Sequence, residues 1–596
     1  MAANINLENF RNLMHQHSID AYIIPMSDPH MSEYMAEHWR IIKWFCGFTG
    51  SAGNVVVTQN FAGLWTDSRY FTQAATQLKN TGVELVKLNI AHTPEYIDWI
   101  AENLPSGSSV AFDGKIFPIK LVKYMEEKLI HKEMKMIPDV DFISELWLQR
   151  PPIPQSKVFI HDIKYAGKSS QEKLFEIRAE MNIENTNYLV ISSLDDIAWT
   201  FNIRGKDISY VPLVICFSII TQSEAILFID ENKLTPEVLE YLDEQGIIIK
   251  PYFEIFNYLN NIKSGKSASI QFSKTSYGIY NAIPKKCQIS DSLNISSKLK
   301  AVKNDVEISN INETMVKDGV AMVKYLYWLN ETMGKEKITE ISASEKLRSF
   351  RGGQIDFFDE SFSPISAFNA NAAMPHYSAT PETDAELKIP GIYLIDSGGQ
   401  YFGGTTDITR TIALGMPTNQ QKTDFTLALK GTIGLAMAIF PYGTKGYQLD
   451  VLARKHLWNN GLNFGHGTGH GVGYFLNVHE GPQTIGTSAS GDINTILQVG
   501  MLTSIEPAFY RDGQYGFRTE NLILVVEHEV TDYGRFLKFE TVTLCPIDLN
   551  LIDIELLDKN EVEWLNNYHK NVYNKISGFL TVDEKNWLKE NTKAIH

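Results

Sequence analysis

The chain has 596 residues, of which 44% are hydrophobic and 21% are charged, the composition of an ordinary soluble globular protein. This length is too great for one hydrophobic core and, at roughly 100–200 residues per domain, predicts three or more domains. The 54 basic and 70 acidic side chains give a net charge of −16. That balance argues against nucleic acid or an anionic membrane as the main partner, because both bind clustered Lys and Arg.

Signals for a membrane or for secretion are not found in the sequence. No stretch approaches the ~18 continuous apolar residues of a membrane helix, and the opening residues are amphipathic, without the apolar core of a secretory signal. The cysteines form no CxxC pair and are expected to be reduced and buried: Cys46, Cys216, Cys287 and Cys545. We therefore expect a cytoplasmic protein.

Residues 1–150 are predicted to form an α/β domain. Amphipathic patterns predict helices at 6–18 and 96–104. Short apolar runs predict strands at 21–25, 54–58, 63–67 and 83–88. Three prolines at positions 151, 152 and 154 then interrupt regular structure and predict a linker.

Residues 151–297 repeat this order of elements, a helix followed by strands. The helix is predicted at 169–185, and the strands at 187–193, 211–220 and 224–230. The recurrence predicts a second α/β domain related to the first.

A third domain is predicted over 298–596, where the pattern of the sequence changes. It begins with a long helical pattern at 299–334, and segments rich in glycine and in strand patterns follow. Glycines cluster at 391–404, 461–473 and 500–516. The residues after Pro546 predict C-terminal helices without chemistry of their own.

Two aspartates in the third domain lie on a predicted β-hairpin. Asp396 ends an apolar strand, and Asp407 begins the next strand pattern eleven residues later. A turn centred near Tyr401 and Phe402 places the two aspartates opposite each other. Carboxylates that close repel unless a proton or a cation lies between them, whereas either aspartate alone is typical of a turn or a helix cap. The pair favours a cation.

Two glutamates repeat this arrangement around a second turn. A two-residue turn at Asp512-Gly513 places Glu506 opposite Thr519, one residue from Glu520. Both glutamates stand in apolar strands, where an unpaired charge costs several kcal/mol or more. A salt bridge to Arg518 is the simple alternative. Two acidic hairpins in one domain favour metal ligands instead.

Histidines supply the third group of candidate ligands. His466, His470 and His479 lie in GHGTGHGVGYFLNVHEGP (465–482), whose glycines leave room for a substrate. Four carboxylates with one imidazole favour two hard or borderline ions such as Mn²⁺ over a single structural zinc. A phosphate-binding loop is disfavoured, because no GKS or GKT follows the glycines.

These motifs closely resemble those of the pita-bread metallopeptidases, the superfamily of methionine aminopeptidase, prolidase and aminopeptidase P. The catalytic motifs are two aspartates spaced D-x10-D, GTGHGVG (467–473), NVHEGP (477–482), SIEP (504–507) and RTEN (518–521). Further motifs resemble the long, three-domain form of Xaa-Pro aminopeptidase: DPHMSEY (28–34), FTGSAGNVVVT (48–58), LWTDSRYF (64–71), SSLDDIAWTFNIRG (192–205) and FNANAAMPHY (368–377). The resemblance spans most of the chain.

The resemblance implies a fold of mixed α/β and α+β class. Two related, creatinase-N-like α/β domains at 1–150 and 151–297 would precede a pita-bread (creatinase/aminopeptidase-like) catalytic domain at 298–596 with a helical extension. It also implies a homodimer. In the first domain, Asp28, His30 and Arg69 fall in matching motifs; they either line an entrance or dimer contact or simply organise turns.

The resemblance also implies the metal site and the reaction. Two divalent ions, Mn²⁺ with Zn²⁺ and Co²⁺ as alternatives, would share a bridging hydroxide that attacks the bond between an N-terminal residue and a following proline. The implied ligands are Asp396 on one ion, His470 and Glu506 on the other, and Asp407 and Glu520 on both. Glu506 would also carry the proton to the leaving nitrogen.

Four further residues are implied to act around the substrate. His376 and His479 would bind the peptide at the scissile bond and stabilise the oxyanion, and His466 would lie near the pocket for proline. Arg518 is also implied to lie at the substrate site, where it would orient Glu520. For His376 a turn histidine, and for Arg518 a generic strand arginine, are the plain alternatives.

Two other functions remain open. A prolidase acting only on Xaa-Pro dipeptides would carry the same five ligands, although the second α/β domain favours the aminopeptidase. Methionine aminopeptidase is disfavoured because it needs neither leading domain. A non-catalytic peptide-binding protein of the same fold typically loses metal ligands, and all five positions are intact here.

Overall fold

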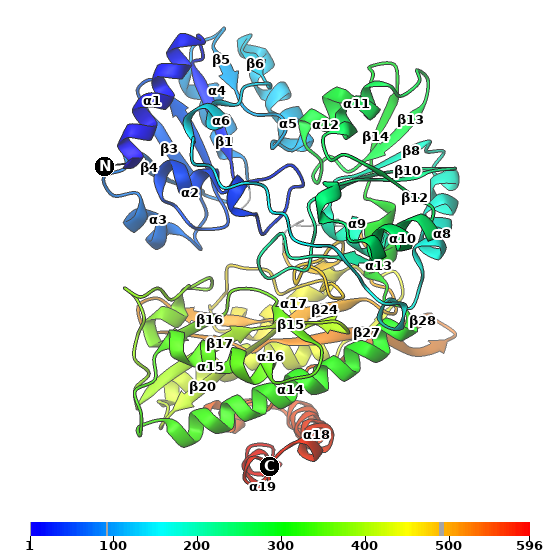
Figure 1. The fold of residues 1–596 in the computed structure, drawn as a ribbon. Coiled ribbons are helices and arrows are strands. Elements are labelled where there is room, and N and C mark those ends of the chain that lie inside the picture. Colours follow the sequence, from blue (N-terminus) through cyan, green and yellow to red (C-terminus); the bar gives the residue numbers. More distant parts are fainter. Residues whose placement is uncertain (1, 91–92, 488–493) are drawn as a thin grey trace. The chain divides into compact units, whose positions relative to one another are not determined.

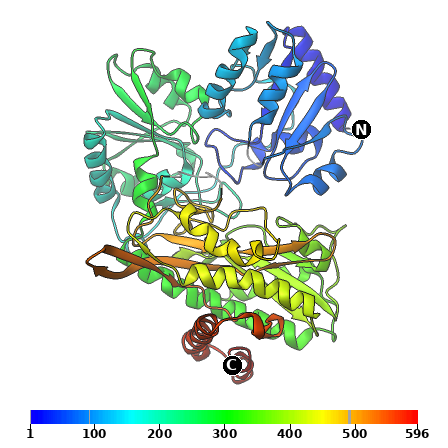
Figure 2. The ribbon, with the colours of Figure 1, turned by 180° about the vertical axis from the view of Figure 1, so that it is seen from behind.

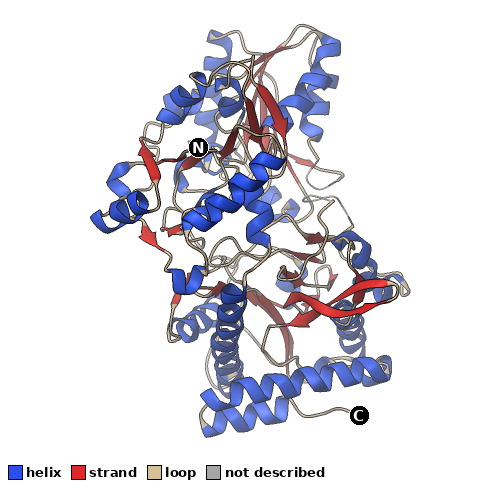
Figure 3. Cartoon of the chain, turned by 90° about the vertical axis from the view of Figure 1, so that its right-hand side faces the viewer, coloured by secondary structure: helices blue, strands red, loops and turns tan. Residues whose placement is uncertain are grey.

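The computed structural model describes residues 2–90, 93–487 and 494–596 (Figure 1). The chain divides into two compact units, which are treated separately below. Unit 1 comprises Met1–Ile160, Lys168–Ser209 and Leu213–Ser296, and unit 2 comprises His161–Gly167, Tyr210–Pro212 and Ser297–His596. Helices and strands of both units are distinguished by colour in Figure 3.

Unit 1 contains two six-stranded sheets. The first has the order β4-β3-β2-β1-β5-β6. Its strands are β1 (Ala21–Pro25), β2 (Asn54–Thr58), β3 (Ala62–Thr66), β4 (Glu84–Lys87), β5 (Ser109–Ala111) and β6 (Lys135–Ile137). Its main helices are α1 (Ala2–Gln16), α4 (Glu95–Asn103) and α5 (Ile119–Leu129). Every residue of β1 is buried, as expected for a central strand with helices on both faces.

The second sheet of unit 1 repeats the topology of the first, with the order β12-β11-β10-β8-β13-β14. Its strands are β8 (Tyr188–Ile191), β10 (Phe217–Thr221), β11 (Ala225–Phe228), β12 (Ile247–Lys250), β13 (Ser267–Ile270) and β14 (Gln288–Asp291), and α8 (Ser170–Ile183) and α10 (Pro236–Glu244) are among its helices. In both sheets the central strand pairs antiparallel on one side and parallel on the other. The two related α/β folds are confirmed, although the predicted strand at 211–220 is regular only from Phe217 onward.

The DPH motif of the first half of unit 1 makes polar contacts with the second half. His30 is buried, and its ring nitrogens lie 2.9 Å from the Ser192 carbonyl oxygen and 2.9 Å from the Tyr252 hydroxyl. Asp28 is also buried and accepts hydrogen bonds from the backbone N–H groups of His30 and Ser32. These residues therefore organise a turn and hold it against the second half.

Unit 2 begins with two helices where the sequence predicted one. Helix α13 (Ile295–Ala301) ends before α14 (Asp305–Thr332) begins, so the single helix expected at 299–334 is wrong. Asn304 caps α14 by accepting from the N–H groups of Val306 and Glu307, and the Glu307 side chain returns a bond to the Asn304 N–H. A capping box of this kind fixes a helix start, and periodicity alone could not reveal it.

Two of the sheets of unit 2 are β16-β17-β20 and β21-β28-β27-β24. These strands are β16 (Ile365–Phe368), β17 (Gly391–Ser397), β20 (Ile408–Leu414), β21 (Ile439–Pro441), β24 (Leu502–Ile505), β27 (Asn521–Thr531) and β28 (Gly534–Thr541). The chief helices are α14, α15 (Glu340–Gly352), α16 (Asn419–Ala436) and α17 (Gly446–Trp458). Figures 1 and 2 show α14 and α15 on one face of the strands and α16 and α17 on the other.

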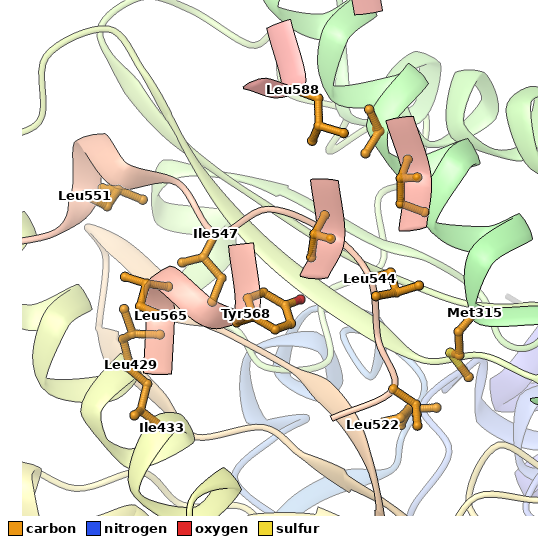
Figure 4. Close-up of a cluster of buried hydrophobic side chains, with 14 of the residues drawn as sticks. Met315, Leu429, Ile433, Leu522, Leu544, Ile547, Leu551, Leu565, Tyr568 and Leu588 are labelled. Atoms are coloured by element: carbon orange, nitrogen blue, oxygen red, sulfur yellow. The ribbon is translucent and has the colours of Figure 1, made fainter. Parts of the chain in front are cut away.

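The C-terminal helices are part of the core of unit 2. Leu565 and Tyr568 of α18 (Lys559–Ile576) and Leu588 of α19 (Val582–Asn591) join a buried cluster with Leu429 of α16 and Leu522 of β27 (Figure 4). Removing a helix that buries such residues would expose the core beneath it.

Two sequence predictions concern cysteines and membranes. All four cysteines are free; Cys46, Cys216 and Cys545 are buried, but Cys287 is only partly buried, which corrects the expectation for it. Among the described residues, no helix is both long and apolar enough to cross a bilayer.

Candidate metal centre

The first acidic pair lies at the antiparallel strands β17 and β20: Asp396 is in β17, and Asp407 directly precedes β20. Asp396 pairs with Thr409, not with Asp407, because the chain turns between β18 (Gly399–Tyr401) and β19 (Gly404–Thr405), one residue later than predicted. Asp407 therefore lies diagonally across from Asp396, a spacing that still allows the side chains to face each other. Both carboxylates are buried.

The second acidic pair also differs in register from the prediction. β25 (Ala508–Arg511) and β26 (Tyr515–Arg518) are joined by three residues, 512–514, rather than by a two-residue turn. Ile505 of β24 pairs with Asn521 of β27, and this register continues into the hairpin. Glu506 consequently lies across from Glu520 itself, so the longer turn brings the glutamates closer than predicted.

His470 joins the carboxylates from a short strand. β22 (Gly469–His470) pairs with β23 (Thr484–Ile485), and the Nε2 atom of His470 lies 3.5 Å from Asp407 Oδ2 and 3.6 Å from Glu506 Oε1. Asp407, His470 and Glu520 each present one ligand atom, and these three atoms all lie within 4.8 Å of one another. One metal ion can contact all three at that spacing.

The electrostatics of this cluster call for a cation. Burial raises the pKa of Asp407 well above its ordinary value, and the charge of Asp396 raises it further. Burial likewise raises the pKa of Glu520, with Asp407 as the next cause, and raises the pKa of Glu506. The Oδ1 atoms of Asp396 and Asp407 are buried without a hydrogen-bond partner. Divalent ions would satisfy these oxygens and remove the repulsion, so the residues fit a dinuclear site.

Arg518 is bonded to the cluster through Asp396. Its Nη2 donates to Asp396 Oδ2 at 2.6 Å, while its Nε donates to Thr409 Oγ1 at 3.1 Å. The Thr409 hydroxyl in turn donates to Glu520 Oε2 at 2.7 Å. Arg518 therefore reaches Glu520 only through Thr409, and its direct partner is Asp396 rather than the glutamate expected from the sequence.

His466 lies beside the carboxylates. Its Nδ1 is 2.7 Å from the Gly467 carbonyl oxygen and 3.8 Å from Glu506 Oε2, and its Nε2 is 2.9 Å from the Tyr510 hydroxyl. Burial, followed by the charge of Arg518, lowers the pKa of His466 to about 3. The imidazole is therefore neutral at neutral pH, with its proton on Nδ1 facing the carbonyl.

The remaining two histidines border the same site. The ring of His479 meets that of His470 edge to face, with centroids 4.3 Å apart and planes at 88°. His376 follows the short helix η4 (Asn369–Ala373) and lies close enough to His466 for its charge to contribute to that residue's lowered pKa, after burial and Arg518. The structure thus brings all nine predicted site residues into one region of unit 2.

Sequence reasoning missed two residues of this region, Thr409 and Tyr510. Thr409 became visible only with the correct register, which pairs it with Asp396. The Tyr510 hydroxyl accepts a hydrogen bond from Arg518 Nη1 at 2.6 Å. The spacing of these residues in the sequence does not predict this contact. A predicted turn one residue later in the chain would have paired Thr409 with Asp396.

Family models match nearly the whole chain. The Creatinase/Prolidase N-terminal domain matches twice, at residues 6–144 and 149–307. Metallopeptidase family M24 matches residues 309–527, and the C-terminal region of peptidase M24 matches 535–595.

Relatives and solved structures agree with these matches over the full length. A protein of Paracoccidioides brasiliensis described as probable Xaa-Pro aminopeptidase P is 38% identical, over 99% of this chain and 98% of that protein. A protein of Verticillium alfalfae with the same description is 39% identical over the same shares. The crystal structure of the X-prolyl aminopeptidase from Caenorhabditis elegans, described as a cytosolic enzyme with a di-nuclear active site, has a TM-score of 0.95, 33% identity and 100% coverage of both chains.

Proposed function

The chain belongs to metallopeptidase family M24, and from that premise we propose that it is a Xaa-Pro aminopeptidase, which removes an N-terminal residue that is followed by proline. The observation that carries the proposal is the likeness to the C. elegans X-prolyl aminopeptidase across all of both chains. By contrast, the structure of a Xaa-Pro dipeptidase from Bacillus anthracis covers 64% of this chain.

The metal centre is proposed to hold two divalent ions. Asp407 and Glu520 would contact both, Asp396 one, and His470 and Glu506 the other; Mn²⁺ is favoured by the carboxylate-rich set, with Zn²⁺ and Co²⁺ as alternatives. When bound, such ions would generate a hydroxide nucleophile from water at neutral pH and would polarise the carbonyl of the scissile bond.

The protein's own residues would handle the substrate and its protons. The nitrogen of proline forms a tertiary amide without an N–H, so the site cannot bind the leaving group through a hydrogen bond from that nitrogen. The site must instead protonate the nitrogen as the bond breaks. Glu506 is proposed to carry that proton, as the family resemblance implies. His479 and His376 are proposed to hold the carbonyl oxygen, and His466 to border the proline ring.

Location and assembly are proposed by likeness alone. The C. elegans enzyme is described as cytosolic, and we expect the same of this protein. A homodimer is proposed from the family resemblance.

A panel of peptides tests the function. Arg-Pro-Pro and longer Xaa-Pro peptides are compared with the dipeptide Gly-Pro, each with Mn²⁺, Zn²⁺ or Co²⁺ added to chelated enzyme. Release of the first residue from the longer peptides is expected, with Mn²⁺ the strongest activator. Cleavage of the dipeptide alone would identify a prolidase, and a protein that binds no metal and cleaves nothing would favour a peptide-binding role.

A further inference from the structure

The loop at 463–468, which carries His466, has no regular secondary structure and is bonded to one arginine of α17. Arg454 is buried, and its Nη1 donates to the Phe464 carbonyl at 2.8 Å and to Asn463 Oδ1 at 3.2 Å. Its Nη2 donates to the carbonyl oxygen of His466 at 2.8 Å. The guanidinium also lies 3.9 Å from the centre of the Phe464 ring. One side chain thus holds three residues of this loop, Asn463, Phe464 and His466.

Asp450, one helical turn earlier on α17, completes the contact. Its Oδ2 accepts from Arg454 Nε at 2.7 Å, and its Oδ1 accepts from the hydroxyl of Thr468. Asp450 is buried as well. Asp450 and Arg454, together called the α17 clamp below, therefore hold the loop at both ends from a rigid helix.

The clamped loop ends inside the metal centre. The carbonyl oxygen of Thr468 accepts the backbone N–H of Glu506 at 2.8 Å. His466 sits between Gly465 and Gly467, whose lack of side chains leaves the loop little stiffness of its own. The ring of His466 hydrogen-bonds to the Gly467 carbonyl within the loop and to the Tyr510 hydroxyl, so its position depends on the backbone that Arg454 holds.

We propose that the α17 clamp positions His466 for substrate, so that Asp450 and Arg454 are positioning residues for cleavage before proline. This inference rests on the proposed function. A guanidinium suits the task because its planar fork donates to several fixed acceptors at once, which a lysine ammonium cannot reproduce. A purely structural pair would stabilise unit 2 without any specific link to His466.

A double-mutant cycle tests the link. Arg454→Lys is expected to lower kcat/KM on Arg-Pro-Pro by on the order of 10- to 100-fold, with unchanged metal content and a folded protein. His466→Ala should cause a similar loss, and the double variant should be no worse than His466→Ala alone. Losses that multiply would overturn the proposal. Arg535→Lys is the matched control, because Arg535 pairs with Glu527 on the exposed β27–β28 hairpin and should leave activity unchanged.

Two further measurements keep the test decisive. Should Arg454→Lys fail to fold, Thr468→Val replaces it, since this change removes only the hydroxyl bonded to Asp450. Nitrogen-15 spectra of labelled histidines, with His466 assigned from the His466→Ala variant, should show a fixed Nδ1–H tautomer that the clamp variants release. An unaltered tautomer would count against the clamp. A wild-type protein that cleaves no Xaa-Pro peptide would contradict the proposed function. The spectra would still test whether the α17 clamp positions His466.

Discussion

Thr409 shows how one small side chain can join two charged ones. Its hydroxyl accepts from Arg518 and donates to Glu520, so the guanidinium and the carboxylate are linked without touching. An oriented carboxylate keeps its second oxygen directed to the site, and such outer contacts commonly tune a metal centre. The shared hydroxyl therefore fixes the direction from which Glu520 meets an ion.

Asp407 is the residue whose loss should matter most for metal. Asp407→Ala removes a proposed ligand of both ions and also relieves a buried carboxylate, so the protein should stay folded while losing its metal and its activity. Metal analysis after gel filtration, with circular dichroism as a check of folding, measures both. Substantial residual activity would remove the two-metal proposal.

His479 should affect turnover rather than metal. His479→Ala leaves the proposed ligands in place, so bound metal should be retained while kcat falls by the equivalent of roughly 2–4 kcal/mol, if the ring stabilises an oxyanion. His528→Ala, at an exposed position on β27, serves as the control. A large loss of metal in the His479 variant would instead indicate a ligand role.

The raised carboxylate pKa values set the pH dependence of the chelated protein. Asp407 and Glu520 ordinarily titrate at 3.8 and 4.5, and in the folded, metal-free state both pKa values are higher. Above these ordinary values the unfolded chain has lost protons that the folded chain keeps, so stability should fall as pH rises. Thermal unfolding of chelated protein between about pH 5 and pH 8 checks this sign.

Metal should reverse that trend by displacing the same protons. Calorimetric titration of Mn²⁺ in two buffers of different ionisation enthalpy should reveal proton release on binding. A midpoint that rises with pH in the chelated protein, or binding without proton release, would contradict the assignment of these pKa shifts.

At the scale of elements, the close approach of β22 to β24 places His470. A Cβ atom added at Gly469 would lie 1.9 Å from the Ser504 carbonyl oxygen, so the two strands can approach only with glycine there. Gly469→Ala should push β22 away, displace His470 and remove most activity and metal affinity. Gly352→Ala at the end of α15, outside the proposed site, is the control, because its added Cβ would meet no atom within 4 Å. Equal activity of the two variants would refute the argument.

Sequence patterns located the acidic hairpins but misjudged both turns. Apolar runs identified β17, β20 and the strands next to the two glutamates, since such runs are a local property of the sequence. Register depends on turn length, and neither turn could be fixed by residue preference: one chain reversal lies at Phe402-Gly403, and the other contains three residues. Because each predicted register was off by one residue, the prediction missed the pairing of Asp396 with Thr409 and did not place Glu506 opposite Glu520.

For the molecule as a whole, metal should stabilise one unit directly. All proposed ligands belong to unit 2, and a ligand stabilises only the state that holds it. Hydrogen exchange with and without Mn²⁺ should show new protection in β17, β20, β22 and β24, and none in the two sheets of unit 1. Equal protection of both units would contradict this expectation.

The repeated sheets of unit 1 were the easier part to predict, and the tail was the harder. A helix followed by apolar strands recurs along the sequence, and the two sheets share one strand order. The helices after Pro546 looked like an appendage, yet Tyr568 donates to the Cys545 carbonyl and Arg410 donates to Tyr568. Such long-range contacts leave no periodic trace in a sequence.

The order of the ligands along the chain has a consequence for how the protein is made. Asp396 emerges from the ribosome well before Glu520, and Arg410, which donates to the Glu520 carbonyl, also requires Tyr568. At ~5–20 residues per second, the leading sheets can fold while the ligand set is still incomplete. A nascent chain that still lacks Glu520 therefore carries an incomplete set of the proposed ligands, and we expect it to bind metal tightly only after synthesis finishes.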